Sequence, residues 1–424
     1  MRYEVQRFGN GLTVATAPMP HMASVSVGLW VGVGGRFEPG ELNGASHFIE
    51  HMLFKGTARR NARQISQAVE GIGGYLNAFT SEENTCFYAK ARAEHFEHLI
   101  GVLSDMFLNS TFDPAEVEKE REVIKEELSM YLDQPQHLVH ELLTEEMWPD
   151  HPLGRPLTGT EATLDGLGRK QLLAFRGNNY VAPALVIAVA GNIEHARVVR
   201  AMQQLAPSFP AGKRPKFQQA WCEQTRPRVR LAQKQTSQLQ LALGFRVCSR
   251  HDERRFALRV LNTILGENAS SRLFQVLRED HGLTYCVHSC VSHFDDVGCL
   301  SVSAGLDSSD LEETMTLMIQ ELSRFTDDVV SPKELREARD YLIGQMEIGL
   351  ESTDNQMMWL GEQILGYGKV VPPEEIKRRI YDVKASEVRK VARDFLRSDR
   401  VTATVVSPLK NSPVLPKALA KLSV

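Results

Sequence analysis

The alternation of apolar and polar side chains along residues 23–33 predicts a β-strand with one buried face. Residues 239–243 open the second half of the chain with a similar strand-like stretch, and residues 401–406 close it with another. Because long helical patterns lie between such stretches in both halves, the sequence predicts sheets covered by helices. The alternating apolar positions of the first stretch are Val25, Val27, Leu29, Val31 and Val33.

Prolines and glycines interrupt every regular pattern between residues 207 and 227. The chain has 424 residues, and a single hydrophobic core stops growing at roughly 250–300 residues. We therefore predict a first domain over residues 1–206, a linker over 207–227 and a second domain over 228–407. Residues 408–424 contain prolines at 408, 413 and 416, and we expect them to form a loosely attached tail.

The two halves share a helix-start pattern. Residues 113–117 read Asp-Pro-Ala-Glu-Val, and residues 331–335 read Ser-Pro-Lys-Glu-Leu. Proline at the first helical position, with glutamate at the third, is typical of helix starts that satisfy exposed backbone N–H groups. Such starts are common, so this pattern alone leaves open whether the halves are a repeat.

The composition is that of an ordinary globular protein, with 42% hydrophobic and 24% charged residues. A net charge of −4 without any run of like charges argues against nucleic acid or an anionic membrane as a partner. No apolar segment reaches the ~18 residues of a membrane helix, and the first residues lack the core of a signal peptide. The six cysteines form no Cys-x-x-Cys pair and are interpreted as reduced thiols, so we expect a cytoplasmic protein.

Residues 45–54 carry apolar residues at helical spacing, which predicts a helix. On it, His47 and His51 are four residues apart and face the same side, with Glu50 on the same arc. Two imidazoles can hold zinc if another element supplies a third ligand, and Glu50 can act as general base toward the attacking water. The order H-x-x-E-H is the inverzincin signature, although two histidines at this spacing also fit an ordinary helix.

A predicted helix that starts after Asp113 carries six glutamates that could complete a metal site. Glu120 and Glu127 are seven residues apart and share a face, but each glutamate could instead pair with a basic neighbour at the surface. The residues alone do not choose among Glu116, Glu118, Glu120, Glu122, Glu126 and Glu127.

Residues 44–57, Gly-Ala-Ser-His-Phe-Ile-Glu-His-Met-Leu-Phe-Lys-Gly-Thr, resemble the active-site helix of the pitrilysin (insulinase) family of zinc metallopeptidases. The resemblance is closest to the bacterial members that are similar to mitochondrial processing peptidase. Further similar segments follow in the family's order through both halves of the chain. They are residues 73–81, 120–127, 151–156 and 270–274.

This resemblance implies an α+β fold of two tandem homologous domains, each an antiparallel sheet covered by helices on one face. The first domain would hold one zinc ion per chain through His47, His51 and Glu127, with Glu50 as general base. Glu120 would orient a ligand from behind, since such carboxylates tune a metal site.

Four further residues match substrate-contacting positions of the family. Asn77 and Ala78 would lie on an edge strand to which an extended peptide adds by backbone hydrogen bonds; the alternative is an ordinary strand with an inward asparagine. Arg278 and Tyr285, in the second domain, would reach the substrate carbonyl opposite the zinc. Otherwise they would be a surface arginine and a core tyrosine.

A rival metal site is conceivable at Cys286, His288 and Cys290, which alternate and would share one face of a strand. A structural zinc site needs four ligands in paired groups, and no fourth ligand has suitable spacing. We therefore expect these residues to be packed strand residues, since free cysteine is often buried.

The resemblance implies a metalloendopeptidase that cleaves oligopeptides or unfolded segments. A specific processing peptidase for leader or targeting peptides and a non-catalytic scaffold subunit of the same fold are the alternatives. The complete His47, Glu50, His51 and Glu127 set argues against the scaffold, because a buried polar cluster is costly. In two-domain family members the chamber closes only when two chains meet, so we expect a homodimer, or a heterodimer with a related chain.

Overall fold

The computed structural model of the chain describes residues 2–221, 223–411 and 414–422. Its residues gather into two compact units, which are described separately. The first unit comprises Met1–Ser129, Arg155–Gln218 and Glu347–Val370, and the second comprises Met130–Gly154, Gln219–Met346 and Val371–Val424. The predicted linker includes the division at residue 218. The prediction of two consecutive domains did not include the segment that each half of the chain contributes to the other unit.

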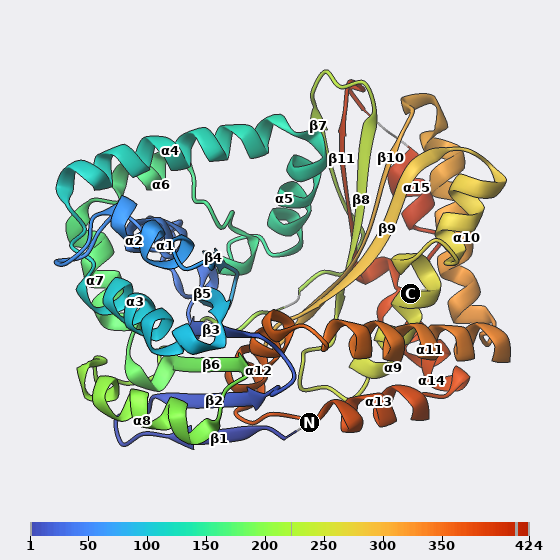
Figure 1. Cartoon of the computed structure of the whole chain (residues 1–424). Coiled ribbons are helices and arrows are strands. Elements are labelled where there is room, and N and C mark those ends of the chain that lie inside the picture. Colours follow the sequence, from blue (N-terminus) through green and yellow to red (C-terminus); the bar gives the residue numbers. More distant parts are fainter. Residues whose placement is uncertain (1, 222, 412–413, 423–424) are drawn as a thin grey trace. The chain divides into compact units, whose positions relative to one another are not determined.

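The first unit is built on a six-stranded sheet with the order β1-β2-β6-β3-β5-β4 (Figure 1). Strands β2 and β6 run parallel and all other neighbours are antiparallel. The predicted antiparallel sheet is confirmed apart from this one pair: β6 follows a long helical connection, and such a crossover allows a parallel pair. The strands are β1 (Glu4–Arg7), β2 (Thr13–Pro18), β3 (Ser24–Val31), β4 (Tyr75–Thr80), β5 (Thr85–Arg92) and β6 (Leu185–Gly191).

The second unit repeats this topology with the order β7-β11-β8-β10-β9. Strands β7 and β11 are its parallel pair, in the place of β2 and β6. The two predicted strands at residues 23–33 and 239–243 occupy the same central position, as β3 and β8, which confirms two tandem domains of similar fold. The strands are β7 (Arg228–Gln233), β8 (Leu239–Val247), β9 (Thr284–His293), β10 (Gly298–Leu306) and β11 (Val401–Ser407).

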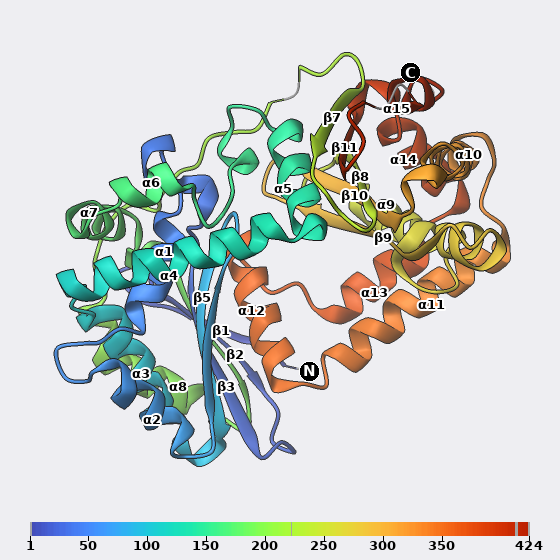
Figure 2. The same ribbon diagram turned by 90° about the horizontal axis from the view of Figure 1, so that it is seen from above.

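Helices cover both faces of the first sheet, not one as predicted. Val27 and Leu29 of β3 belong to a core with the helices α1 and α3, whereas Trp30 packs on the opposite face with Met357 of α12. Figure 2 shows α3 on one side of the sheet and α12 on the other. The side chains on both faces of β3 are buried, so each face needs a layer of helices. The helices of this unit are α1 (Ala45–Leu53), α2 (Ala62–Glu70), α3 (Phe96–Asn109), α4 (Pro114–Asp133), α6 (Glu161–Gly166), α7 (Arg169–Asn179), α8 (His195–Leu205) and α12 (Thr353–Tyr367).

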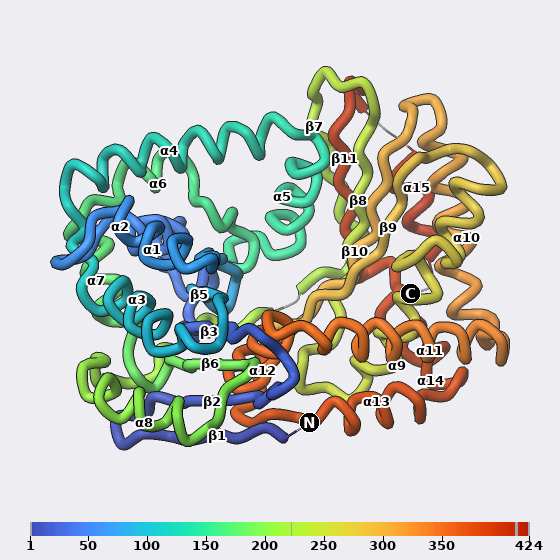
Figure 3. Tube along the Cα trace, in the orientation of Figure 1, coloured from blue at the N-terminus to red at the C-terminus, as the bar shows by residue number. Residues whose placement is uncertain are grey.

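The second sheet is covered in the same way. Leu241 and Leu243 of β8 pack into the core with α9, α10 and α14, and Ala242 packs on the other face with Leu143 of α5. Thus α5 belongs to the first half of the chain but to the second unit, and α12 belongs to the second half but to the first unit. Each follows a long helix along the chain, as the tube trace shows (Figure 3). The helices are α5 (Pro135–Met147), α9 (Arg255–Asn262), α10 (Leu311–Asp327), α11 (Pro332–Gly349), α13 (Pro373–Asp382), α14 (Ala385–Phe395) and α15 (Val414–Leu419).

The expectation of a loosely attached tail is wrong for residues 414–422. Helix α15 buries Leu415 and Leu419, and Leu422 beyond it is also buried in the core of the second unit. Pro416 did not exclude a helix, because a proline in the first turn loses no intrahelical hydrogen bond. Residues 412, 413, 423 and 424 of the predicted tail lie outside the described residues. No helix in the described part of the chain has the length and hydropathy needed to cross a membrane.

Candidate metal centre

Helix α1 forms as predicted and presents His47, Glu50 and His51. Its opposite side is buried and fixes the helix against the sheet, which determines the side on which the three polar residues lie. The helix starts after Gly44, whose φ is +95°. A Cβ at this position would lie 2.8 Å from the carbonyl oxygen of Thr158, so both the backbone conformation and the space require glycine.

Helix α4 crosses α1 (Figure 2). It carries Glu127, whose carboxylate lies near the rings of both histidines. Oε2 of Glu127 is 3.7 Å from Nε2 of His47 and 3.7 Å from Nε2 of His51. These distances are too long for hydrogen bonds. Two ligands at about 2.1 Å from one tetrahedral ion are separated by about 3.4 Å, so the spacing fits a shared zinc ion.

The donor set is also chemically suited to zinc, which accepts imidazole nitrogen and carboxylate oxygen in sites that keep a position open. The pKa of His47 is lowered to about 4, mainly by burial and to a smaller extent by the nearby His51. A neutral imidazole is the form that binds a metal. Among the described residues, His47, His51 and Glu127 are the single group of three with such convergent ligand atoms.

The packing of α4 separates the six candidate glutamates by the side of the helix on which they lie. Val117, Ile124 and Leu128 are buried, which turns Glu120 and Glu127 toward α1. The other candidates lie on the outer side of the helix. Glu116, Glu118 and Glu122 form ion pairs with Lys119, Arg121 and Lys125, and Glu126 is exposed.

Glu120 lies on the side of the His51 ring that faces away from Glu127. Its Oε2 is 3.1 Å from Nδ1 of His51, and its Oε1 forms an ion pair of 2.6 Å with Lys55. An N–H of His51 that donates to this carboxylate leaves Nε2 unprotonated and directed at Glu127. The sequence did not predict Lys55, which lies four residues after His51 and just beyond the end of α1.

Glu50 lies beside the three candidate ligands, and a residue of the first sheet fixes the position of its carboxylate. Its Oε2 accepts a hydrogen bond of 2.6 Å from Oγ1 of Thr80, at the end of β4. Burial raises the pKa of Glu50, while the bond from Thr80 and the nearby His51 oppose that shift. Thr80 was not predicted, because only the tertiary fold brings β4 to α1.

The predicted substrate strand is β4, which lies at the edge of the first sheet and pairs only with β5. Asn77 is exposed, and its Oδ1 accepts a hydrogen bond of 2.8 Å from the backbone N–H of Ala78. The side chain of Asn77 therefore satisfies the N–H of Ala78, a group that an added strand would use.

The structure brings Arg278 and Tyr285 together within the second unit. The guanidinium of Arg278 lies 4.6 Å from the centre of the Tyr285 ring. Tyr285 is 77% exposed, so it is not a core tyrosine. Their contact with substrate stays a prediction.

The expectation of packed residues at Cys286, His288 and Cys290 is wrong. Cys286 and Cys290 are exposed on β9, which is the edge strand of its sheet. Successive side chains of a strand lie on opposite faces of the sheet, and Cys286, His288 and Cys290 lie on the face of β9 that is exposed. These residues also do not form a group of convergent metal ligands.

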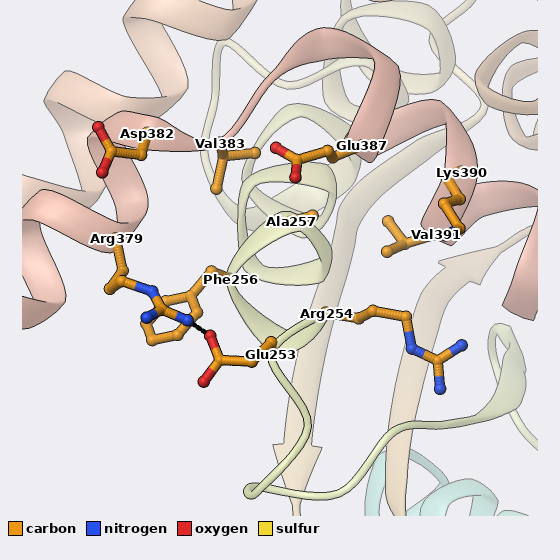
Figure 4. A pocket seen from close by; sticks show the side chains of 10 residues that line it. All are labelled: Glu253, Arg254, Phe256, Ala257, Arg379, Asp382, Val383, Glu387, Lys390 and Val391. Carbon is orange, nitrogen blue, oxygen red and sulfur yellow. Dashed lines mark ion pairs between the residues drawn. The ribbon is translucent and has the colours of Figure 1, made fainter.

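The second unit contains a cavity of about 240 Å³ beside α9, α13 and α14 (Figure 4). Several of its charged side chains form ion pairs: Glu253 pairs with Arg379, and Arg254 pairs with Asp252 and Asp394. No group of metal ligands lies in it. The lining residues are Glu253, Arg254, Phe256, Ala257, Arg379, Asp382, Val383, Glu387, Lys390 and Val391.

The fold and the centre on α1 and α4 define the class of zinc metallopeptidases. Residues 13–161 match the family model for insulinase, peptidase family M16, and residues 166–342 match the model of the peptidase M16 inactive domain. The chain belongs to peptidase family M16, the insulinase family.

Similar proteins extend over nearly the whole chain. An uncharacterized zinc protease of Bacillus subtilis, YmxG, is 38% identical over 97% of this chain and 99% of its own length. An uncharacterized zinc protease of Streptomyces coelicolor is 38% identical over 95% of this chain and 88% of its own.

Two solved structures share the fold. A protease from Helicobacter pylori superimposes with a TM-score of 0.90 at 20% identity, covering 96% of this chain and 99% of its own. A peptidase M16 inactive domain from Pseudomonas fluorescens superimposes with a TM-score of 0.89 at 19% identity, covering 97% and 100%.

Proposed function

We propose that this protein is a zinc metalloendopeptidase that cleaves oligopeptides or unfolded segments. His47, His51 and Glu127 would hold one zinc ion per chain, and Glu50 would act as the general base. The observation that carries the proposal is the convergence of the two Nε2 atoms on Oε2 of Glu127, at 3.7 Å each. The names of the relatives, which are zinc proteases, support zinc as the metal.

The bound ion would supply Lewis acidity, which lowers the pKa of water and polarises a carbonyl. Glu50 takes the proton of the attacking water and delivers it to the leaving nitrogen, because its carboxylate lies beside the ligands and is oriented by Thr80. Its raised pKa brings the carboxyl closer to neutral pH, where a group can both accept and return a proton.

The edge strand β4 supports extended backbone as the substrate. A peptide that adds to β4 must be locally unfolded, and main-chain pairing recognises any sequence. Asn77 and Ala78 would contact the peptide there. We include Arg278 and Tyr285 as donors to the substrate carbonyl, a role that family resemblance suggests and that their mutual contact supports.

A digest of a mixed peptide library by the purified, zinc-loaded protein tests this function. Mass spectrometry should show internal cleavage of many unrelated peptides, with zinc near one equivalent per chain by elemental analysis. Cleavage restricted to one narrow sequence class would indicate a processing peptidase. No cleavage by the zinc-loaded protein would contradict the proposal and favour the scaffold.

We also propose that the protein acts as a homodimer in the cytoplasm. The resemblance to two-domain family members supports the dimer, and the scattered cysteines of the sequence, without a Cys-x-x-Cys pair, support a reducing compartment. Sedimentation velocity should show a dimer, and a fully active monomer would refute it.

A further inference from the structure

Glu38 is a buried carboxylate aimed at the start of α1. Only 2% of the residue is exposed. Its Oε2 accepts hydrogen bonds from the backbone N–H of Gly44, at 2.8 Å, and from Nδ2 of Asn43, at 3.3 Å. Its Oε1 accepts a bond of 2.6 Å from the backbone N–H of Ser46. Both oxygens therefore serve one short segment at the start of the helix.

This carboxylate replaces the capping side chain that α1 lacks. The N-cap residue is Gly44, which has no side chain to accept from the first turn. The first N–H groups of a helix have no intrahelical partner, and leaving them unpaired in a buried place is costly. A negative charge is also favoured at a helix N-terminus.

A second segment holds Glu38 in place. Nη1 of Arg155 donates to the backbone oxygen of Glu38, at 3.0 Å, and Nδ2 of Asn43 donates to the oxygen of Pro156, at 2.9 Å. Gly44 and Gly159 pack closely, because a Cβ on either glycine would lie about 3 Å from the other residue. The start of α1 is thus fixed from outside the helix.

The consequence falls on His47, the residue after Ser46. Nδ1 of His51 contacts Glu120, but Nδ1 of His47 is buried and makes no hydrogen bond. No side-chain partner orients the ring of His47 from behind. Its position depends on the backbone of the first turn, which Glu38 holds.

We propose that Glu38 is a positioning residue for the metal centre: by fixing the first turn of α1, it determines where His47 presents its imidazole. This inference rests on the proposed ligands His47, His51 and Glu127. Glu38 itself contacts none of these side chains in the interactions described above.

The test compares the zinc affinity of the wild type with those of Glu38→Gln and Glu41→Gln, by competition with a chromogenic chelator. Glutamine retains the size of Glu38 but turns an N–H₂ toward one of the N–H donors. We expect the affinity of Glu38→Gln to fall about tenfold, as when a group that orients a ligand is lost. Glu41 is exposed in the same segment, and its variant should stay within about twofold of the wild type.

Zinc affinity of Glu38→Gln within about twofold of the wild type would overturn the proposal. Thermal unfolding of the metal-free proteins, measured in parallel, separates positioning from a general loss of structure: a positioning role lowers affinity even where Tm is retained. A parallel fall in Tm that accounts for the affinity loss would count against positioning.

A measurement on the wild type holds even if the variant does not fold. Hydrogen exchange at the amides of Gly44 and Ser46 should be as slow as inside α1, since Glu38 protects both, and rapid exchange there would overturn the proposal. Glu127→Gln in the same zinc assay distinguishes the two hypotheses. Unchanged affinity in that variant would contradict the ligand set and not the role of Glu38 in holding the helix.

Discussion

The ammonium group of Lys55 lies 2.6 Å from a carboxylate oxygen of Glu120, a residue that is 1% exposed. This ion pair gives the buried carboxylate a counter-charge. Glu120 in turn contacts His51, so a basic residue just beyond the end of α1 acts on the candidate metal ligand through Glu120.

Lys55→Gln should weaken zinc binding without abolishing it. Loss of the ammonium leaves the charge of Glu120 buried and unpaired, which weakens the orientation of His51. We expect roughly tenfold lower zinc affinity by chelator competition. Lys119→Gln is the matched control, because Lys119 is an exposed lysine on α4 that pairs with Glu116 at the surface. Equal affinities for the two variants would contradict the role of Lys55.

Glu50→Gln should retain zinc but lose peptide hydrolysis. The amide cannot accept the proton of water, and general-base catalysis contributes about 10²–10⁴-fold. We expect kcat/KM to fall by that factor, with the zinc content measured by elemental analysis unchanged. Substantial hydrolysis by the variant would assign the proton transfer to another group.

Glu127→Gln and Glu126→Gln form an adjacent pair that tests the third ligand. Glu127 faces the histidines, whereas Glu126 is exposed. Dialysis against a mild chelator should strip zinc from the Glu127 variant, with an affinity loss of about 100-fold or more, and leave the Glu126 variant loaded. The reverse result would place the ligand on Glu126.

The stability of the metal-free protein should depend on pH through Glu38. Burial raises the pKa of Glu38 to about 7, against the N–H bonds of Ser46 and Gly44, which lower it. A carboxyl group whose pKa is higher in the folded than in the unfolded protein stabilises the fold while it is protonated. For Glu38 this stabilisation is fully present below about pH 4.5 and is lost as the pH rises through about 7. The free energy of unfolding of the wild type, relative to Glu38→Gln, should fall by about 3 kcal/mol over that interval. Denaturant titrations at several pH values measure this difference, and a constant difference would contradict the shift.

Leu419→Ala should destabilise the protein by about 2–5 kcal/mol, as expected for truncation of a buried leucine. Leu419 is completely buried in the core of the second unit, whereas Lys417 of the same helix is exposed. Lys417→Ala should therefore have little effect in the same denaturant titration. Similar stabilities for both variants would restore the interpretation of residues 408–424 as a loose tail.

The features that the sequence predicted well are local ones. The helix at residues 45–54 and the strand at residues 23–33 follow from the spacing of apolar residues within one element. The spacing of His47, Glu50 and His51 likewise lies within a single helix, so no tertiary information was needed to group them.

The features that it did not predict depend on which elements pack together. Apolar spacing shows that α12 buries a face but not that this face covers Trp30 of the other half. Likewise, choosing Glu127 among six glutamates required either the resemblance or the burial of Ile124 and Leu128 on α4. The sequence did not predict the capping of α1 by Glu38, because the chain between Glu38 and the helix is an irregular loop whose path has no sequence pattern.

The packing of α12, from the second half of the chain, on the first sheet has a consequence for synthesis on the ribosome. The first sheet is complete once β6 has been made, but the layer over Trp30 and Ala188 arrives only with Thr353–Tyr367. Until then, a nascent chain exposes an apolar sheet surface to water and to other chains. A chain cut at residue 218 would keep that surface uncovered, so neither half is expected to fold alone as a stable, soluble fragment.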